Sequence, residues 1–363
     1  MRSIADLDKN FTVNTDLGKD DIEWYDVTAE PFELYGTEKK ADKPFSRLPK
    51  DVARAASKSV GILSERHAGV RARFSTDSPY IAIKAVMSEV YPMGHMAFSG
   101  NAGFDLYVDD GDRSEYARTF IPPSDMTDGY EALWDMNPAT RRPMGNVECY
   151  TLYFPLYNPV SRVYIGIKRG SKLGRGGQYR DIPPVLYYGS SITQGACATR
   201  PGNAYPSMIT RDHNVDHRNF GFSGNCKGEL VLAQYFSSIE ASVFVCDYDH
   251  NTPDAEHLEA TYYPFYKEYR KNNPTTPYIM VTRTDCLWNS EKMINDCKAI
   301  IHNAYLKAKS EGDENVYFID GSKIFEGYQR GSCLADGGHP TDIGFLRMAE
   351  VIGGLVGKLI NRE

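Results

Sequence analysis

The sequence predicts an α/β protein in which an antiparallel β-sandwich precedes a parallel sheet that is covered by helices on both faces. Three observations lead to this prediction. The chain has 363 residues, which is enough for two domains that each bury a sizeable core. Its first half contains short segments with alternating polar and apolar residues. Its second half alternates apolar runs with helical patterns. We place the boundary between residues 177 and 178.

The first half, residues 1–177, is predicted to be a jelly-roll-like accessory β-sandwich. Alternation at period two, typical of strands with one buried face, occurs in segments 70–74, 81–85 and 163–167. Turn-forming residues separate such segments, for example at 75–79. Many short strands with few helical periods favour an antiparallel sandwich. The glycines and charges of residues 170–178 suit a linker to the second domain.

The second half, residues 178–363, changes period after Pro184. Strand-like apolar runs occur at 185–188, 218–222, 243–246, 278–282 and 316–319, with helical stretches between them. The last helix is the clearest, because apolar residues recur at steps of three and four from Phe345 to Leu359. Alternating strands and helices predict a parallel sheet covered on both faces, with ligands bound beyond the carboxyl ends of its strands.

Composition and charge exclude several classes of protein. Hydrophobic residues make up 41% and charged residues 25% of the chain, as in soluble globular proteins. A net charge of -7 offers no basic face, so we expect no nucleic-acid partner. No apolar run approaches the roughly 18 residues that span a bilayer, so we expect no membrane association. Residues 1–10 lack the apolar core of a signal peptide, which predicts a cytoplasmic protein unless a signal for export to the periplasm or medium has been removed.

Cysteines and aromatic residues give weaker indications. The seven cysteines include no Cys-x-x-Cys pair, so the sequence predicts neither a zinc site nor a disulfide framework. Twenty-five tyrosines and three tryptophans are many for this length. Most of these rings are expected in the core, and the alternative is that some offer flat faces to sugar rings.

Polar residues follow four of the five predicted strands, at the edge where ligands are expected. Ser191 follows the first strand within Gly189-Ser190-Ser191, and a glycine-rich turn with Gly224 follows the second. Asn251 follows the third, and the segment 336–340 follows the fifth after a loop. Because the carboxyl ends of parallel strands meet at one edge, these four turns are predicted to converge.

These residue types suit nucleophilic catalysis. A serine hydroxyl needs a base, and the base needs an acid that holds its tautomer. Asp336 and His339 are three residues apart at the start of a helix, so they can meet within one turn and serve Ser191. The backbone N–H groups of Ser191 and Gly224 and the side-chain amide of Asn251 would stabilise an oxyanion. Each residue also has an ordinary explanation as a turn or a helix cap.

At this point the sequence resembles the SGNH (GDSL-type) hydrolases. Blocks 189–193, 219–224 and 336–340 match that family in order, and Gly103-Phe104-Asp105-Leu106-Tyr107 resembles the Gly-x-Asp-Leu-Tyr signature of a β-rich domain found before some bacterial SGNH esterases. The resemblance implies a flavodoxin-like three-layer domain and chemistry without metal or cofactor. It also implies a serine nucleophile, an Asp-x-x-His pair, and glycine and asparagine in the oxyanion hole.

The chain departs from the family pattern at two places. Ser190 stands at the position of the aspartate in the family name, which leaves the catalytic groups intact because the following serine is the nucleophile. The family's Gly-x-Asn-Asp block is absent, and Asp247-Tyr248-Asp249-His250-Asn251 takes its place. Asn251 is assigned to the oxyanion hole as the only asparagine there.

These features predict a serine esterase that hydrolyses small acyl esters through an acyl-enzyme. The resemblance and the accessory β domain favour acetyl groups on a glycan, and a small-molecule ester is the other substrate class. Two rival functions are an acyltransferase on the same scaffold and an inactive carbohydrate-binding protein. Ser191, Asp336 and His339 favour an active enzyme over the latter.

Three further candidates accompany this prediction. Arg200 follows the nucleophile closely enough to line a substrate site, although it could instead stiffen its loop. His250 and His257, with the acids at 247, 249 and 254, could be drawn as a metal cluster, but a loop and a helix start explain them better. His95, flanked by two methionines, is expected at the domain interface.

Overall fold

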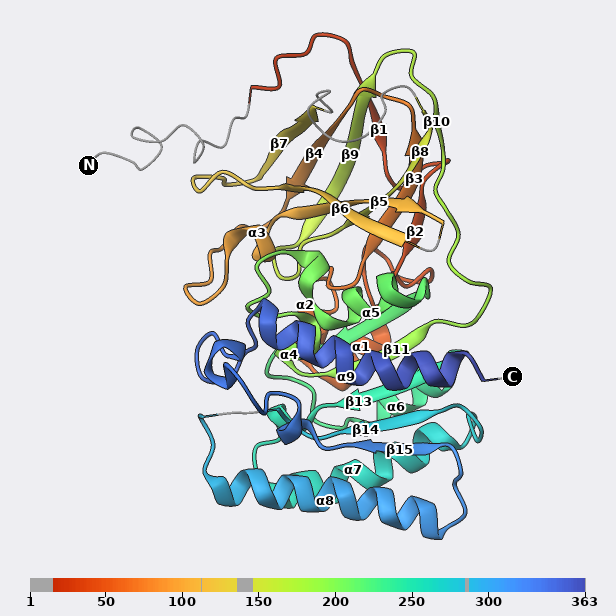
Figure 1. Ribbon diagram of the computed structural model, residues 1–363, viewed down its shortest axis with the longest axis vertical. Coiled ribbons are helices and arrows are strands. Elements are labelled where there is room, and N and C mark those ends of the chain that lie inside the picture. Colours follow the sequence, from red (N-terminus) through yellow and green to blue (C-terminus); the bar gives the residue numbers. More distant parts are fainter. Residues whose placement is uncertain (1–15, 112, 136–145, 285–286, 363) are drawn as a thin grey trace, which may run out of the picture.

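The first part of the chain folds into two antiparallel sheets, as predicted. The computed structural model describes residues 16–111, 113–135, 146–284 and 287–362 (Figure 1). The first sheet has the strand order β1 (Ile22–Asp26), β9 (Val160–Lys168), β4 (Tyr80–Met87), β7 (Gly129–Asp135). The second has the order β10 (Leu173–Arg175), β3 (Arg71–Thr76), β8 (Glu148–Tyr153), β5 (Phe104–Asp110), β6 (Arg113–Phe120), with β2 (Glu33–Tyr35) also pairing with β3.

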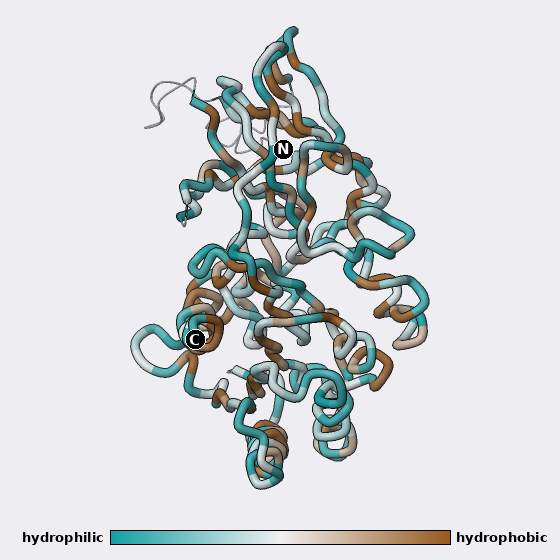
Figure 2. The backbone as a smooth tube through the Cα atoms, turned by 90° about the vertical axis from the view of Figure 1, so that its right-hand side faces the viewer, coloured by the Kyte–Doolittle hydropathy of each residue, from teal (hydrophilic) through white to brown (hydrophobic). Residues whose placement is uncertain are grey.

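The inner faces of these two sheets share one hydrophobic core. Phe74, Leu106 and Leu152 come from the second sheet and Ile83 and Ile165 from the first, and none of these side chains is exposed. Hydrophobic residues recur along the strands in Figure 2, whereas the outer loops are mostly hydrophilic. Burial of apolar area between two sheets is what holds a β-sandwich together.

The prediction that each strand has one buried face is wrong for β3, in which all six residues are buried. Its two arginines are buried because they find partners, Arg71 in the second part of the molecule and Arg73 at Asp109 of β5. Arg71 pairs with Asp216 and donates from Nε to the Tyr179 hydroxyl at 2.7 Å, and Arg73 lies over the Tyr179 ring. A charged face can be buried when it finds such partners, and the alternation in sequence does not reveal them.

The second part contains a parallel sheet of five strands, which lies below the sandwich in Figure 1. Its order is β12 (His217–Gly221), β11 (Val185–Gly189), β13 (Val243–Asp247), β14 (Tyr278–Val281), β15 (Val316–Ile319). All five predicted runs form these strands. The first strand lies between the second and the third, which is the flavodoxin-like order, so the predicted fold class is confirmed.

Helices cover both faces of the parallel sheet. Leu186 and Tyr188 of β11 point to a core shared with α6 (Leu230–Ser237), α7 (Ala255–Arg270) and α8 (Glu291–Ser310). The alternate residues, Val185 and Tyr187, point to a core shared with α5 (Tyr205–His213) and α9 (Asp342–Ile360). The apolar stripe predicted for the last helix lies on the sheet in α9. Within the described residues, no helix combines the length and the apolar character needed to cross a bilayer.

Short elements complete the chain. They are α1 (Lys50–Ala56), α2 (Lys58–Leu63), α3 (Phe98–Asn101), α4 (Ser191–Gln194), η3 (Pro201–Asn203), η4 (Asp249–Asn251), η5 (Gly321–Lys323) and η6 (Arg330–Cys333). Buried tyrosines fill much of the core, and Tyr188, for example, stacks on Phe265 with ring centroids 4.8 Å apart. These tyrosines lie in the core, as expected for most of the aromatic rings. Among the described residues, Cys149, Cys197, Cys226, Cys246 and Cys297 take part in no disulfide.

The segment that carries Arg47 and helices α1 and α2 connects the sandwich to the parallel sheet in a way that the sequence did not predict. Helices α1 and α2 precede β3 in the chain, yet Ala53 and Val60 belong to the core of the parallel sheet. Arg47, fully buried, donates to the carbonyl oxygens of Asn219 at 2.7 Å and Gly221 at 2.9 Å at the end of β12. Within the stretch 170–178, expected to be a linker, β10 pairs with β3. The division at residue 177 stays a prediction.

Candidate active site

Three neighbouring strands end level at the carboxyl edge of the parallel sheet. Gly189 of β11 lies opposite Gly221 of β12 and Asp247 of β13. A Cβ on Gly189 would lie 2.1 Å from the Thr193 hydroxyl and 2.5 Å from the Asp247 carbonyl oxygen, so this position requires glycine. The turns that carry Ser191, Gly224 and Asn251 therefore start from the same edge.

Ser191 is the first residue of the short helix α4, directly after β11. Ser190 has an extended backbone, and its hydroxyl accepts a hydrogen bond from the Ile192 N–H at 3.2 Å, so it caps the helix. The helix ends at Gly195, whose φ of 106° favours glycine. This strand, sharp turn and helix resemble the arrangement that presents a nucleophile at the top of a sheet. The two adjacent serines thus have different structural roles.

The predicted trio of Ser191, His339 and Asp336 is brought together. The Ser191 hydroxyl lies 2.8 Å from His339 Nε2, and His339 Nδ1 lies 2.8 Å from Asp336 Oδ2. The other carboxylate oxygen, Oδ1, accepts the backbone N–H groups of Gly338 at 3.1 Å and His339 at 2.8 Å. Burial raises the pKa of Asp336, but the hydrogen bonds from His339 lower it by more. The pKa of this carboxyl group is therefore below its ordinary value.

An ionised Asp336 determines where the imidazole proton lies. Its carboxylate accepts a hydrogen bond from Nδ1, so the neutral ring carries its proton there and leaves a lone pair on Nε2. That lone pair points at the Ser191 hydroxyl, 2.8 Å away. The geometry suits removal of the hydroxyl proton by His339.

The proposed oxyanion donors lie on three turns. Asn251 Oδ1 accepts the Cys226 N–H at 3.3 Å, which joins the second turn to the third and leaves the Nδ2 group to donate elsewhere. Gly224 has a φ of 69°, a conformation that favours glycine. Among the described residues, neither the Ser191 N–H nor the Gly224 N–H has a hydrogen-bond acceptor. Their joint role stays a prediction.

The contacts of Arg200 are those of a residue that stiffens its loop. Asp105 of the Gly-x-Asp-Leu-Tyr segment is fully buried and accepts hydrogen bonds from Arg200 Nη1 at 3.0 Å and the Gly202 N–H at 2.9 Å. The Arg200 guanidinium also lies 4.2 Å from the centroid of the Tyr116 ring. The sandwich thereby fixes the turn that follows the nucleophile helix. These contacts favour the loop-stiffening explanation over the predicted role in substrate binding.

Two aromatic side chains lie against His339. The ring centroid of His95 is 5.5 Å away, and that of Trp288 is 4.9 Å away with its plane nearly perpendicular. Trp288 donates from Nε1 to the Asp336 carbonyl oxygen at 2.9 Å, and a Cβ on Gly338 would lie only 2.5 Å from its ring. His95 lies at the interface, as predicted. Trp288 was not predicted, although a Leu-Trp pair in a polar loop after the fourth strand was a signal.

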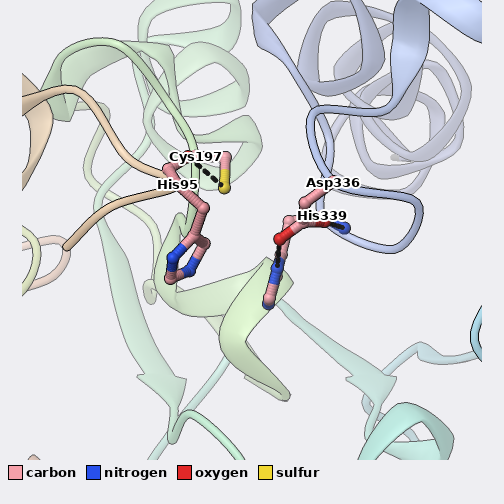
Figure 3. Close-up of side chains that lie close together, drawn as sticks. All are labelled: His95, Cys197, Asp336 and His339. Atoms are coloured by element: carbon pink, nitrogen blue, oxygen red, sulfur yellow. Dashed lines mark hydrogen bonds and ion pairs between the residues drawn. The ribbon is translucent and has the colours of Figure 1, made fainter.

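The alternative metal cluster around His250 and His257 is not assembled in the described part of the chain. Asp249 instead forms an ion pair with Arg283, Oδ2 to Nε 3.2 Å, and His257 Nε2 lies 2.9 Å from the Lys227 carbonyl oxygen. A different group of possible ligands, shown in Figure 3, does come together beside the serine. It consists of His95, Cys197, Asp336 and His339.

A doubly wound sheet that carries a hydrogen-bonded serine, histidine and aspartate at its carboxyl edge is the architecture of a serine hydrolase. Residues 183–356 match the profile of the GDSL-like lipase/acylhydrolase family. Residues 22–173 match the profile of the GxDLY N-terminus of SGNH-hydrolase-type esterases. Residues 183–356 are therefore a GDSL-like lipase/acylhydrolase domain and residues 22–173 a GxDLY domain, which confirms the resemblance seen in the sequence.

Solved structures give the same fold over nearly the whole chain. A protein of Bacteroides ovatus assigned to the GDSL-like lipases is 25% identical, with a TM-score of 0.84 over 94% of this chain and 99% of that one. A salicylyl-acyltransferase from a tetracycline biosynthetic pathway is 19% identical, with a TM-score of 0.76 over 95% and 100%. An acetyl xylan esterase from Butyrivibrio proteoclasticus is 12% identical, with a TM-score of 0.55 over 93% and 98%. No curated protein matches the sequence. The fold is thus that of GDSL-type esterases and acyltransferases.

Proposed function

We propose that this protein is a serine esterase that removes small acyl groups, with acetyl the expected one, from a carbohydrate. The observation that carries the proposal is the relay of two 2.8 Å contacts, from the Ser191 hydroxyl to His339 and from His339 to Asp336. Serine is a weak nucleophile until a neighbouring base can take its proton, and this arrangement supplies both the base and the group that orients it.

The reaction has two steps in this proposal. His339 Nε2 takes the Ser191 proton as Oγ attacks the ester carbonyl, and the same proton passes to the departing alkoxide when the ester bond breaks. Water, deprotonated by His339, then attacks the acyl-enzyme, and the proton returns to Ser191 as the acid leaves. In both steps the N–H groups of Ser191 and Gly224 and the Asn251 amide stabilise the oxyanion.

The oxyanion assignment is tested at Asn251. Replacement of one such donor costs about 10²- to 10³-fold in kcat, and we expect this loss in Asn251→Ala. The Asn251→Asp protein separates catalysis from structure, because its carboxylate keeps an acceptor for the Cys226 N–H but cannot donate. We expect at least the same loss with an unchanged melting temperature. If kcat of Asn251→Asp is within threefold of the parent value, Asn251 is not an oxyanion donor.

The carbohydrate part of the proposal is supported by Trp288 and by the structural relatives. Trp288 is 57% exposed while one part of its ring contacts His339, so a flat indole surface lies beside the reacting groups. Among the structural relatives are family two carbohydrate esterases, one of them from Clostridium thermocellum solved with cellohexaose. The tyrosine content adds no support, since many of these rings fill the core.

Trp288 allows the carbohydrate to be tested separately from the chemistry. We expect Trp288→Ala to raise KM for an acetylated xylo-oligosaccharide by roughly three- to tenfold through lost stacking. The KM for p-nitrophenyl acetate, which has no sugar, should change much less. The Trp288→Phe protein keeps an aromatic ring, so its KM for the oligosaccharide should be close to that of the parent. Equal changes for both substrates in Trp288→Ala would argue against a sugar at this position.

The second candidate, an acyltransferase, is favoured by the overall similarity to the salicylyl-acyltransferase. Both functions share the acyl-enzyme and differ in the acceptor. The test is to form the acyl-enzyme with p-nitrophenyl acetate and to measure its fate with and without a sugar alcohol. Release as acetate at a rate independent of the alcohol supports the esterase. Transfer to the alcohol supports the acyltransferase, and sugar binding without any ester turnover supports a binding protein.

A further inference from the structure

The group of His95, Cys197, Asp336 and His339 joins three separate segments of the chain. His95 belongs to the loop before α3 in the sandwich, Cys197 follows α4, and the other two precede α9. One possible ligand atom from each residue lies within 4.8 Å of all the others. In Figure 3 the His95 ring and the Cys197 sulfur come from one side of the site and face Asp336 and His339 on the other.

We propose that these four residues bind a soft divalent cation such as Zn²⁺ and that the cation reversibly blocks the catalytic base. The blocking effect rests on the proposed function, whereas the binding does not. Two imidazoles, a thiolate and a carboxylate are the donors that Zn²⁺ prefers. The cation would act as an inhibitor, since the proposed reaction uses only side chains and backbone groups.

The spacing of the group is close to what a cation needs. Bond lengths of about 2.0–2.3 Å in a tetrahedral site place neighbouring ligand atoms roughly 3.3–3.8 Å apart. The present separations, up to 4.8 Å, need only small side-chain movements. The His95 side chain is exposed, so it can move toward the other three ligands. Its exposure also makes the site accessible to a cation from solvent.

Cys197 is the residue that distinguishes this site from a pair of surface histidines. Its thiol is buried and lies 3.1 Å from the His95 carbonyl oxygen, to which it donates. A bound cation displaces the thiol proton and makes a bond to sulfur.

A cation at this position stops catalysis whichever nitrogen of His339 it takes. If it binds Nε2, the lone pair that faces Ser191 is occupied. If it binds Nδ1, the ring proton must lie on Nε2, which then donates to the Ser191 hydroxyl and cannot accept its proton. Asp336 would also exchange its contact with the imidazole for one with the metal. Both modes leave the fold intact and the base disabled.

The binding is tested in the Ser191→Ala protein, which keeps all four ligands. Titration with Co²⁺ should produce a thiolate-to-cobalt charge-transfer band in the near ultraviolet. Adding Cys197→Ser should abolish the band, and adding His95→Ala should weaken Co²⁺ binding by at least about tenfold. Two controls, Cys149→Ser in the sandwich and His302→Ala on the exposed face of α8, should leave it unchanged. A band that survives Cys197→Ser would overturn the proposal.

Inhibition is tested separately with the parent enzyme and p-nitrophenyl acetate. Zn²⁺ should inhibit turnover, a chelator should restore it, and the His95→Ala protein should need at least about tenfold more Zn²⁺ for half-inhibition of its own activity. Equal sensitivity of the parent and His95→Ala would contradict the assignment. If the parent has no ester turnover, the proposed function fails, and the Co²⁺ titration still decides whether the site binds a cation.

Discussion

The Ser191→Ala protein is expected to lose at least about 10⁴-fold in kcat for p-nitrophenyl acetate while it keeps its melting temperature. The Ser191 hydroxyl contacts His339 and is the atom that forms the acyl bond in our proposal. Its removal leaves binding and oxyanion stabilisation, which account for the residual rate. The measurement is steady-state kinetics on both proteins, with thermal unfolding as the check on folding.

Ser190→Ala is the matched control, because the two serines are adjacent and buried. Ser190 caps α4 through its contact with the Ile192 N–H, so its loss should cost about 1 kcal/mol of stability. We expect kcat to stay within about threefold of the parent, since the nucleophile and its base are retained. A large loss of activity in Ser190→Ala with little loss in Ser191→Ala would show that Ser190, and not Ser191, is the nucleophile.

The Asp336→Asn protein is expected to lose about 10⁴-fold in kcat, although the change replaces a single oxygen by an NH₂ group. The remaining carbonyl oxygen must accept the N–H groups of Gly338 and His339, so the new NH₂ group faces His339 Nδ1. That nitrogen then has to accept, and the ring proton moves to Nε2. An imidazole in this tautomer cannot take the Ser191 proton.

Asp320→Asn is the control for this substitution. Asp320 also accepts a backbone N–H two residues further on, that of Ser322 at 3.2 Å, and it also contacts a basic group, Lys298. The Asp320→Asn protein should lose some stability and keep its kcat. A loss of less than tenfold in Asp336→Asn, measured at saturating substrate, would show that Asp336 does not orient the base.

The strands and the meeting of Ser191, His339 and Asp336 could be predicted because most of their signals are local in sequence. Four of the five parallel strands are largely apolar runs, β12 being the exception, and Asp336 and His339 are three residues apart, so one turn brings them together. The placement of Ser191 beside His339 needed one further rule, that parallel strands present their carboxyl ends at one edge. These parts required no knowledge of how distant segments pack.

The features that escaped prediction all depend on contacts between distant segments. The alternation in β3 could not reveal that Arg71 would meet Asp216 across the interface. Arg200 follows the nucleophile in sequence, but its partner is Asp105 in the sandwich. Trp288 reaches His339 from another loop, and no local pattern specifies that contact. The GxDLY domain therefore has a physical role that its motif alone did not disclose, since its aspartate fixes the turn after Ser191.

The central claim, that Ser191 is an activated nucleophile, is tested most directly by labelling with a serine-reactive fluorophosphonate followed by peptide mass spectrometry. We predict one adduct, on Ser191, that is absent from Ser191→Ala and strongly slowed in Asp336→Asn. Ser190→Ala should label like the parent. An adduct on another residue, or no adduct on a folded protein that still turns over ester, would contradict the account.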